Sequence, residues 1–248
     1  MTDPVLEIRN LVKSFGGVKA SDDISLQIKP QETHAIIGPN GAGKTTLVSQ
    51  LSGGLKPDAG SIYFNGRDIT GLPVHKRSAI GLARSFQITS LIMSMSVLDN
   101  VALGVQARDG HSFKFWKPAR AARNIRSGAR QILEQLGLAD KAATKVSALS
   151  HGERRQVEIA VALAGKPLLL LLDEPMAGMG ASESATMVEI LKSMKGEKTI
   201  VLIEHDMDAV FALADRISVL VYGRIIATGT PADIRDNHDV RQAYLGEM

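Results

Sequence analysis

The stretch GPNGAGKT, residues 38–45, constrains the fold of this chain more than any other feature. It follows a short apolar segment, residues 33–38, and precedes a segment with helical character, residues 44–51. This is the G-x-x-x-x-G-K-[ST] pattern in its required setting, with a strand before it and a helix after it. Its glycines let backbone N–H groups converge on phosphate oxygens, and the helix N-terminus adds partial positive charge. The stretch predicts a phosphate-binding loop in an α/β protein, against the plain alternative of a glycine turn with a chance Lys-Thr.

Each residue of this loop is a candidate nucleotide contact. Lys44 supplies a full positive charge for the β- and γ-phosphates, the hydroxyl of Thr45 is a candidate Mg²⁺ ligand, and Thr46 is expected to reach a phosphate further back. The predicted contacts are Gly38, Pro39, Asn40, Gly41, Ala42, Gly43, Lys44, Thr45 and Thr46.

A second motif, LLLLLDEP, ends an apolar run with two adjacent acids. Residues 168–172 are too few to span a membrane and predict a buried parallel strand. Successive strand residues point to opposite faces, so Asp173 and Glu174 are expected to have different roles. We expect Asp173 to contact Mg²⁺ and Glu174 to polarise an attacking water. An ordinary exit from a strand into a loop is the alternative, and the phosphate loop upstream makes it less favoured.

The rest of the chain alternates strand and helix patterns around a helical middle. Alternating or apolar runs at residues 5–10, 24–29, 61–66 and 199–206 predict strands, and residues 216–229 predict a hairpin that turns at Tyr222-Gly223. Residues 98–164 carry apolar residues at helical spacing, with Gly137 as a helix end. Residues 230–248 predict a short helical tail with Thr230 as N-cap and Pro231 in the first turn.

Composition excludes several other classes. The 248 residues have a formal net charge of only +3, with both signs mixed along the chain, so no nucleic-acid partner is expected. There is no cysteine, which excludes disulfides and cysteine-based zinc sites. We expect no signal peptide, since the start lacks an apolar region, and no membrane span, since no window approaches ~18 apolar residues.

Taken in order, these motifs resemble the nucleotide-binding subunit of an ABC transporter over essentially the whole chain. GPNGAGKT matches the Walker A loop, LLLLLDEP matches Walker B, and LSHGE (residues 149–153) occupies the signature position. Gln87 matches the Q-loop glutamine, AGMG (residues 177–180) the D-loop, and His205 the switch histidine. Phe15 matches the aromatic residue that stacks on adenine.

The resemblance implies a single ABC ATPase domain over residues 1–248. Its fold would be α/β, a P-loop NTPase core with a mixed sheet, an antiparallel β subdomain and an inserted α-helical subdomain. Residues 1–87 and 166–229 would form the core and the β subdomain, residues 88–165 the helical signature subdomain, and residues 230–248 the C-terminal tail.

The resemblance also implies the activity and the cofactors, ATP and Mg²⁺. Glu174, His205 and Gln87 would be catalytic, with Gln87 also a metal ligand beside Thr45 and Asp173. Ser150, Gly152 and Glu153 would contact the nucleotide from the signature.

Several partners follow from the same resemblance. Two ATPase subunits, identical or homologous, would pack head to tail, each signature closing over the other's ATP. Membrane permease subunits would receive the motion through the segment after Gln87, where Met93 and Met95 either form a docking groove or pack internally. An external solute-binding protein would act indirectly, and the subunit would lie peripherally on the cytoplasmic face of the inner membrane.

The finer branch resembled is the ATPase group of branched-chain amino acid importers, by runs such as SHGERRQVEIA and IEHDMD. The ATPase of lipopolysaccharide export is a near relative and stays an alternative. So does a soluble, non-transport ABC protein, although those usually carry two cassettes or long insertions. The presence of Glu174, Gln87 and His205 disfavours a nucleotide switch without hydrolysis.

Two positions depart from the usual pattern. His151 replaces the first signature glycine, but Ser150 and Gly152, which carry the expected phosphate contacts, are retained. Gly180 replaces the acidic or amide residue common in the D-loop, and the missing side chain is expected to weaken coupling through that loop. The basic-aromatic residues 111–118 predict an exposed loop, with a contact to a permease or to lipid headgroups as the alternative.

Overall fold

The computed structural model describes residues 3–84, 91–108 and 123–242. Within them the larger sheet has the strand order β10-β9-β3-β8-β7-β6. Neighbouring strands run parallel except β10, which is antiparallel to β9, so the sheet is mixed as predicted. The strands are β3 (Thr33–Ile37), β6 (Leu82–Arg84), β7 (Leu169–Asp173), β8 (Thr199–Ile203), β9 (Arg216–Val221) and β10 (Arg224–Gly229).

A second, antiparallel sheet has the order β2-β1-β4-β5. Its strands are β1 (Leu6–Phe15), β2 (Val18–Ile28), β4 (Ala59–Phe64) and β5 (Arg67–Asp68). Strands β1 and β2 are longer than predicted and form one hairpin that turns at residues 16–17. The turn between β4 and β5 is the predicted Asn-Gly pair, in which Asn65 and Gly66 both have positive φ.

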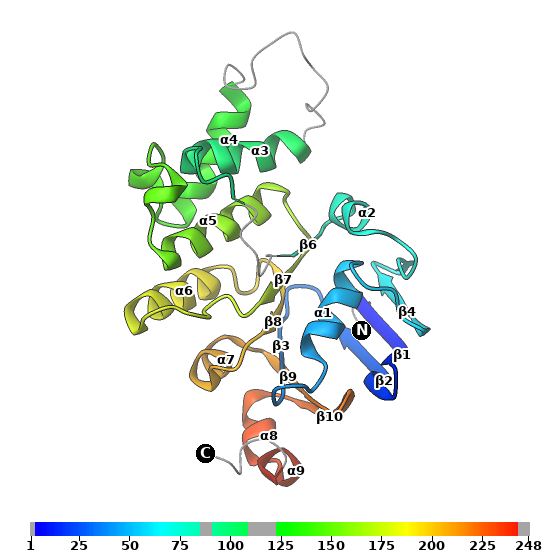
Figure 1. The fold of residues 1–248 in the computed structure, drawn as a ribbon. Coiled ribbons are helices and arrows are strands. Elements are labelled where there is room, and N and C mark those ends of the chain that lie inside the picture. Colours follow the sequence, from blue (N-terminus) through cyan, green and yellow to red (C-terminus); the bar gives the residue numbers. More distant parts are fainter. Residues whose placement is uncertain (1–2, 85–90, 109–122, 243–248) are drawn as a thin grey trace.

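Helical elements separate β6 from β7 in the chain, as the sequence predicted, and pack together at one end of the molecule (Figure 1). Helix α3 contacts both α4 and α5. Gly137, with φ of 68°, follows α4 closely as expected. The elements are α3 (Val97–Arg108), α4 (Arg123–Gln135), η3 (Ala139–Lys141), η4 (Val146–Ala148) and α5 (His151–Ala164).

The larger sheet is buried on both faces, which explains its uninterrupted apolar strands. In β7, Leu170 and Leu172 join the core beneath the helical segment, while Leu169 and Leu171 join the core beneath the antiparallel sheet. The predicted strand start was wrong by one residue, because Leu168 is half exposed and β7 begins at Leu169.

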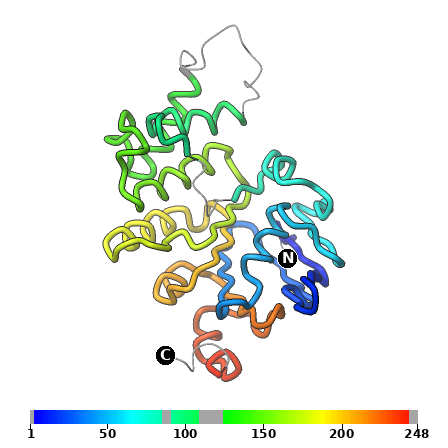
Figure 2. Tube along the Cα trace, in the orientation of Figure 1, coloured from blue at the N-terminus to red at the C-terminus, as the bar shows by residue number. Residues whose placement is uncertain are grey.

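The remaining helices flank the sheet or end the described chain. They are α1 (Lys44–Ser52), α2 (Val74–Ala79), α6 (Ala181–Ser193), α7 (Met207–Leu213), α8 (Pro231–Asp236) and α9 (His238–Val240). Thr230 caps α8 and Pro231 begins it, as predicted. Figure 2 follows the chain from the blue strands through the green helices to the red C-terminal helices. Among the described residues, no helix is long and apolar enough to cross a membrane.

Candidate functional site

Three adjacent parallel strands bring the predicted catalytic segments to one edge of the larger sheet. Strand β3 lies beside β8, and β8 lies beside β7, all in the same direction. The phosphate loop follows β3, Glu174 follows β7, and His205 comes two residues after β8 ends. Since ligands of such sheets bind at the carboxyl ends of the strands, this topology alone gathers the three segments.

The phosphate loop turns tightly into α1. Gly43 has φ of 107°, and a Cβ atom there would collide with the Ala20 carbonyl oxygen, so the position requires glycine. Gly38 and Ala42 are buried, whereas Asn40, Gly41 and Thr45 are exposed. The loop therefore has a packed underside and an open face where a phosphate can bind.

Lys44 lies folded back over this loop. Its Nζ donates to the carbonyl oxygens of Gly38 at 2.6 Å and Pro39 at 3.0 Å. Burial lowers the pKa of Lys44, and the negative charges of Glu174 and Asp173 act in the opposite direction. The ammonium group is thus held between the loop and the acidic strand end, where a phosphate oxygen can replace its carbonyl partners.

Asp173, the last residue of β7, is nearly fully buried. Its Oδ2 accepts a hydrogen bond from Arg84 Nη2 at 3.0 Å, and Arg84 Nη1 donates to Ser52 Oγ at 3.2 Å. Sequence reasoning missed Arg84, although it lies in the ARSFQ stretch that contains Gln87. The arginine ties the end of β7 to the end of α1, the helix that follows the phosphate loop.

Glu174 adopts a left-handed backbone conformation, with φ of 48°. Strand β7 ends at Asp173, so strand alternation does not extend to Glu174, and it is the backbone turn that separates the two acids. The Glu174 N–H donates to the Ile203 carbonyl oxygen at 2.9 Å. Left-handed non-glycine residues are uncommon and concentrate at functional sites.

Glu204 is a buried carboxylate that sequence reasoning also missed. Its Oε1 accepts from the Met176 N–H at 2.9 Å and its Oε2 from the His205 N–H at 3.0 Å. The imidazole of His205 itself is mostly exposed. Glu204 therefore fixes the backbone on both sides of the site, just after Glu174 and at His205. The signal was its place at the end of β8, directly before the histidine.

Phe15 lies at the tip of the β1–β2 hairpin and is 52% exposed, with Lys13 Nζ 5.5 Å from its ring centroid. An exposed ring of this kind can stack on a base. Gln87, the predicted catalytic and metal-binding glutamine, lies outside the described residues, as do residues 111–118.

The signature residues begin helix α5. Ser150 is the N-cap: its Oγ accepts from the Glu153 N–H, while the Ser150 N–H donates to Glu153 Oε2 at 2.9 Å. This backbone hydrogen bond lowers the pKa of Glu153. Glu153 thus has a structural role in the capping box, and Ser150 and Gly152 stand at a helix N-terminus suited to anions.

His151 and Gly180, the two residues that depart from the usual family pattern, both take part in contacts between the signature and the predicted D-loop. His151 Nε2 lies 3.2 Å from the Ala177 carbonyl oxygen, in the predicted D-loop. Glu183 on α6 accepts from Ser150 Oγ at 2.9 Å and from the Gly180 N–H at 3.4 Å. The signature and the D-loop of one subunit are therefore joined by two side chains.

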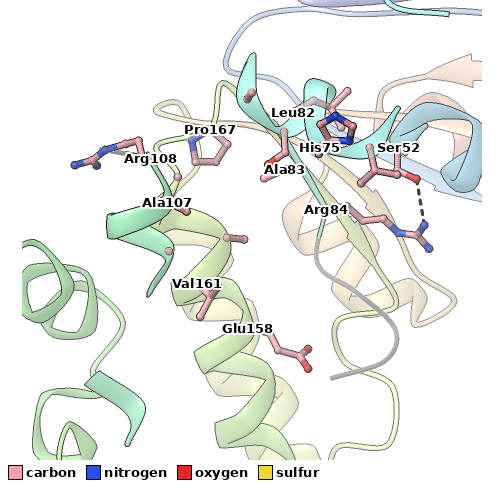
Figure 3. Close-up of a pocket in the computed structure, with 16 residues that line it drawn as sticks. Ser52, His75, Leu82, Ala83, Arg84, Ala107, Arg108, Glu158, Val161 and Pro167 are labelled. Carbon is pink, nitrogen blue, oxygen red and sulfur yellow. Dashed lines mark hydrogen bonds between the residues drawn. The ribbon is translucent and has the colours of Figure 1, made fainter. Parts of the chain in front are cut away.

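A groove of about 710 Å³ lies between the core and the helical segment, lined from α2, β6, α3 and α5 (Figure 3). Arg84 points from β6 toward Ser52, and Glu158 projects from α5. Burial raises the pKa of Glu158, against the opposing effect of Arg155, whose Nη1 is 2.9 Å from Glu158 Oε2. The groove thus combines apolar walls with a largely buried acid.

Comparison with known proteins agrees with this geometry. The profile described as "ABC transporter" matches residues 21–177, and "Branched-chain amino acid ATP-binding cassette transporter" matches residues 224–248. The high-affinity branched-chain amino acid transport ATP-binding protein LivG of Salmonella typhimurium is 39% identical, with all of both chains covered. The lipopolysaccharide export system ATP-binding protein LptB of Escherichia coli is 34% identical, covering 98% of this chain and 97% of LptB.

Among solved structures, the ADP conformation of MJ1267, an ATP-binding cassette of an ABC transporter, superposes with a TM-score of 0.87. It is 32% identical, and the match covers 99% of this chain and 100% of that one. A full-length match at this identity extends beyond the fold to the family. The chain therefore belongs to the ABC transporter family and is an ATP-binding, ATP-hydrolysing subunit of a transporter.

Proposed function

We propose that this subunit powers an importer of branched-chain amino acids or a related small solute. The observation that carries the proposal is the full-length similarity to LivG, joined by the match of residues 224–248 to the family described as "Branched-chain amino acid ATP-binding cassette transporter". The direction of transport and the class of solute come to this chain from those relatives.

A role is assigned to each site residue, and position supports it for all of them except Gln87, which lies outside the described residues. Lys44 neutralises the phosphates, Phe15 stacks on adenine, and Glu174 accepts the proton of the attacking water. His205 and Gln87 contact the γ-phosphate region, and the loop glycines donate backbone N–H groups. The convergence of three strand ends and the left-handed turn at Glu174 support these assignments.

The residues present fit Mg²⁺. Among the described residues, no group of three or more His, Cys, Asp or Glu side chains can hold a metal ion. Mg²⁺ in phosphate sites needs only one or two protein oxygens, since the nucleotide and water supply the rest. The exposed hydroxyl of Thr45 and the carboxylate of Asp173 are such hard donors, and the ion would neutralise charge on the phosphates.

The subunit is proposed to act in a pair, with the Ser150 end of α5 closing over the nucleotide of a second ATPase subunit. Ser150 and Gly152 lie at the start of α5, whereas the phosphate loop leads into α1. In the proposed pair, the two residues would complete a phosphate site together with the phosphate loop of the other subunit. Whether the pair is of identical or homologous subunits leaves this geometry unchanged.

Permease subunits are proposed to bind at the groove between the core and the helical segment, holding the subunit at the cytoplasmic face of the membrane. Residues 93–95 precede α3, one of the helices that line the groove, and they are hydrogen-bonded to the backbone that leads into the signature. The Ser147 N–H donates to the Met93 carbonyl oxygen, and the Val146 N–H to that of Met95, each at 3.0 Å. A shift of residues 93–95 would thus move the backbone just before Ser150.

Export is the second candidate, because LptB is also matched over nearly its full length. The higher identity to LivG and the profile match at residues 224–248 favour import.

Purification of the tagged subunit from membranes tests the proposal. Recovery of two permeases and a solute-binding protein that binds branched-chain amino acids or small amides would support it. Recovery of permeases with a lipid-carrying partner would instead indicate export.

A further inference from the structure

The feature that the proposed roles leave unexplained is Glu183, at the start of α6. Its Oε1 accepts the hydroxyl hydrogen of Ser150 at 2.9 Å, and its Oε2 lies 3.4 Å from the Gly180 N–H. A serine hydroxyl has one hydrogen to donate. While Glu183 holds that hydrogen, Ser150 cannot donate it to a phosphate.

Gly152 gives independent support. A Cβ atom at Gly152 would lie 2.7 Å from Cδ and 2.8 Å from Oε1 of Glu183. The carboxylate is therefore pressed against both residues that would bind the phosphate, at the N-terminus of α5. This terminus attracts anions, and in the free subunit the anion is a side chain of the protein itself.

The space around Ser150 is large enough for a phosphate to replace the Glu183 carboxylate. Ser150, Gly152 and Glu183 line an open polar depression of about 340 Å³, together with Lys141. Lys141 Nζ is 3.2 Å from Glu153 Oε1, so a cation lies beside the signature. A phosphate entering this depression would meet the negative charge of Glu183, and like charges in contact repel each other even in water.

We propose that Glu183 is a positioning residue that occupies the signature hydroxyl in the free subunit and is replaced there by the γ-phosphate of the partner's nucleotide. When the Glu183 side chain moves away, its Oε2 also leaves the Gly180 N–H. The arrival of nucleotide at the signature is thereby transmitted to the D-loop of the same subunit through the Glu183 side chain, although Gly180 itself has no side chain. This inference rests on the proposed pairing of the signature with a second subunit's ATP.

The test uses the assembled transporter purified through a tag on this chain, with ATP hydrolysis followed against ATP concentration. Glu183→Gln keeps the shape of the side chain and removes its charge. The half-saturating ATP concentration is expected to fall about three- to tenfold, the effect of losing one like charge near the phosphate. Glu189→Gln is the matched control: it removes the charge of an exposed carboxylate on the same helix, which pairs with Lys192, and it should change nothing.

Ser150→Ala distinguishes the proposed contact of Ser150 with the partner's nucleotide from the proposed role of Glu183. It is expected to raise the half-saturating ATP concentration, and Glu183→Gln added to it should lower that concentration by less than it does in the wild type, because the charge effect remains but there is no hydroxyl to release. If Ser150→Ala raises that concentration but Glu183→Gln leaves it unchanged or raises it, Glu183 is only a structural link and the inference is overturned. If Ser150→Ala itself has no effect, the proposed pairing of subunits fails and the role of Glu183 fails with it. Thermal melting of each variant identifies any that are misfolded, and Glu183→Ala then provides a second variant without the charge.

Discussion

The strand-end region and the signature region hold their functional residues in opposite ways. At the strand ends, Asp173 and Glu204 are nearly fully buried, and neighbouring parallel strands set the geometry. At the signature, Ser150 and His151 are exposed, and their side chains are hydrogen-bonded to Glu183 in α6 and to the Ala177 carbonyl oxygen before α6, respectively. This difference supports the proposal that the signature region exchanges its hydrogen-bond partners when it closes on another subunit.

Removing the proposed base should have the largest effect. Glu174→Gln is expected to lower kcat at least about 100-fold, because general-base catalysis contributes that much, while ATP binding persists. Turnover and equilibrium binding of ATP are measured on the same preparation, with Glu189→Gln as control. Rapid hydrolysis by Glu174→Gln would show that another group activates the water.

Loss of the loop charge should come next. Lys44→Ala is expected to weaken ATP binding about 10- to 100-fold, since a hydrogen bond to a charged group contributes about 1.5–3 kcal/mol. Titration of a fluorescent ATP analogue measures this change, and Lys192→Ala on the surface of α6 is the control. Unchanged affinity would mean that the loop does not hold the phosphates through this lysine.

Glu204 tests whether the buried region depends on its internal hydrogen bonds. Glu204→Gln places an amide hydrogen opposite one of two backbone donors, so the free energy of unfolding should fall by about 1–3 kcal/mol. We expect kcat to fall more than the affinity for ATP, because the segments moved contain Glu174 and His205 rather than the phosphate loop. A normal kcat in a fully folded variant would argue against Glu204 as a positioning residue.

The smallest effect is expected at the exposed signature. His151→Gly removes one hydrogen bond, to Ala177, of about 1 kcal/mol. ATPase activity of the assembled complex should stay within about fivefold of the wild type, since Ser150 and Gly152 are retained. A much larger loss would place the imidazole itself in the reaction.

The sequence predicted the local features well because neighbouring residues determine them. Local conformational preferences explain the turns at Asn65-Gly66 and Tyr222-Gly223, the cap at Thr230 and the end of α4 shortly before Gly137. The phosphate loop belongs to the same class, since its motif, strand and helix are contiguous.

Contacts between distant segments were not predictable in this way. Arg84 reaches Asp173 only because β6 pairs with β7, and Glu183 reaches Ser150 only because α6 starts beside α5. The long β1–β2 hairpin was predicted as two short strands, because its polar outer residues hide the alternation. In the signature, the sequence marked His151 only as a departure from the usual glycine, and its contact with the Ala177 carbonyl oxygen in the predicted D-loop appears only in the structure.

Transport itself tests the central claim most directly. The complex purified through this chain, reconstituted in vesicles with ATP on the side of this subunit and the co-purified binding protein on the other, is given radiolabelled leucine, isoleucine and valine. We predict accumulation of at least one of them on the ATP side, dependent on ATP and abolished by Glu174→Gln. Continued ATP hydrolysis with no inward movement of these or related small solutes would contradict the assignment as an importer.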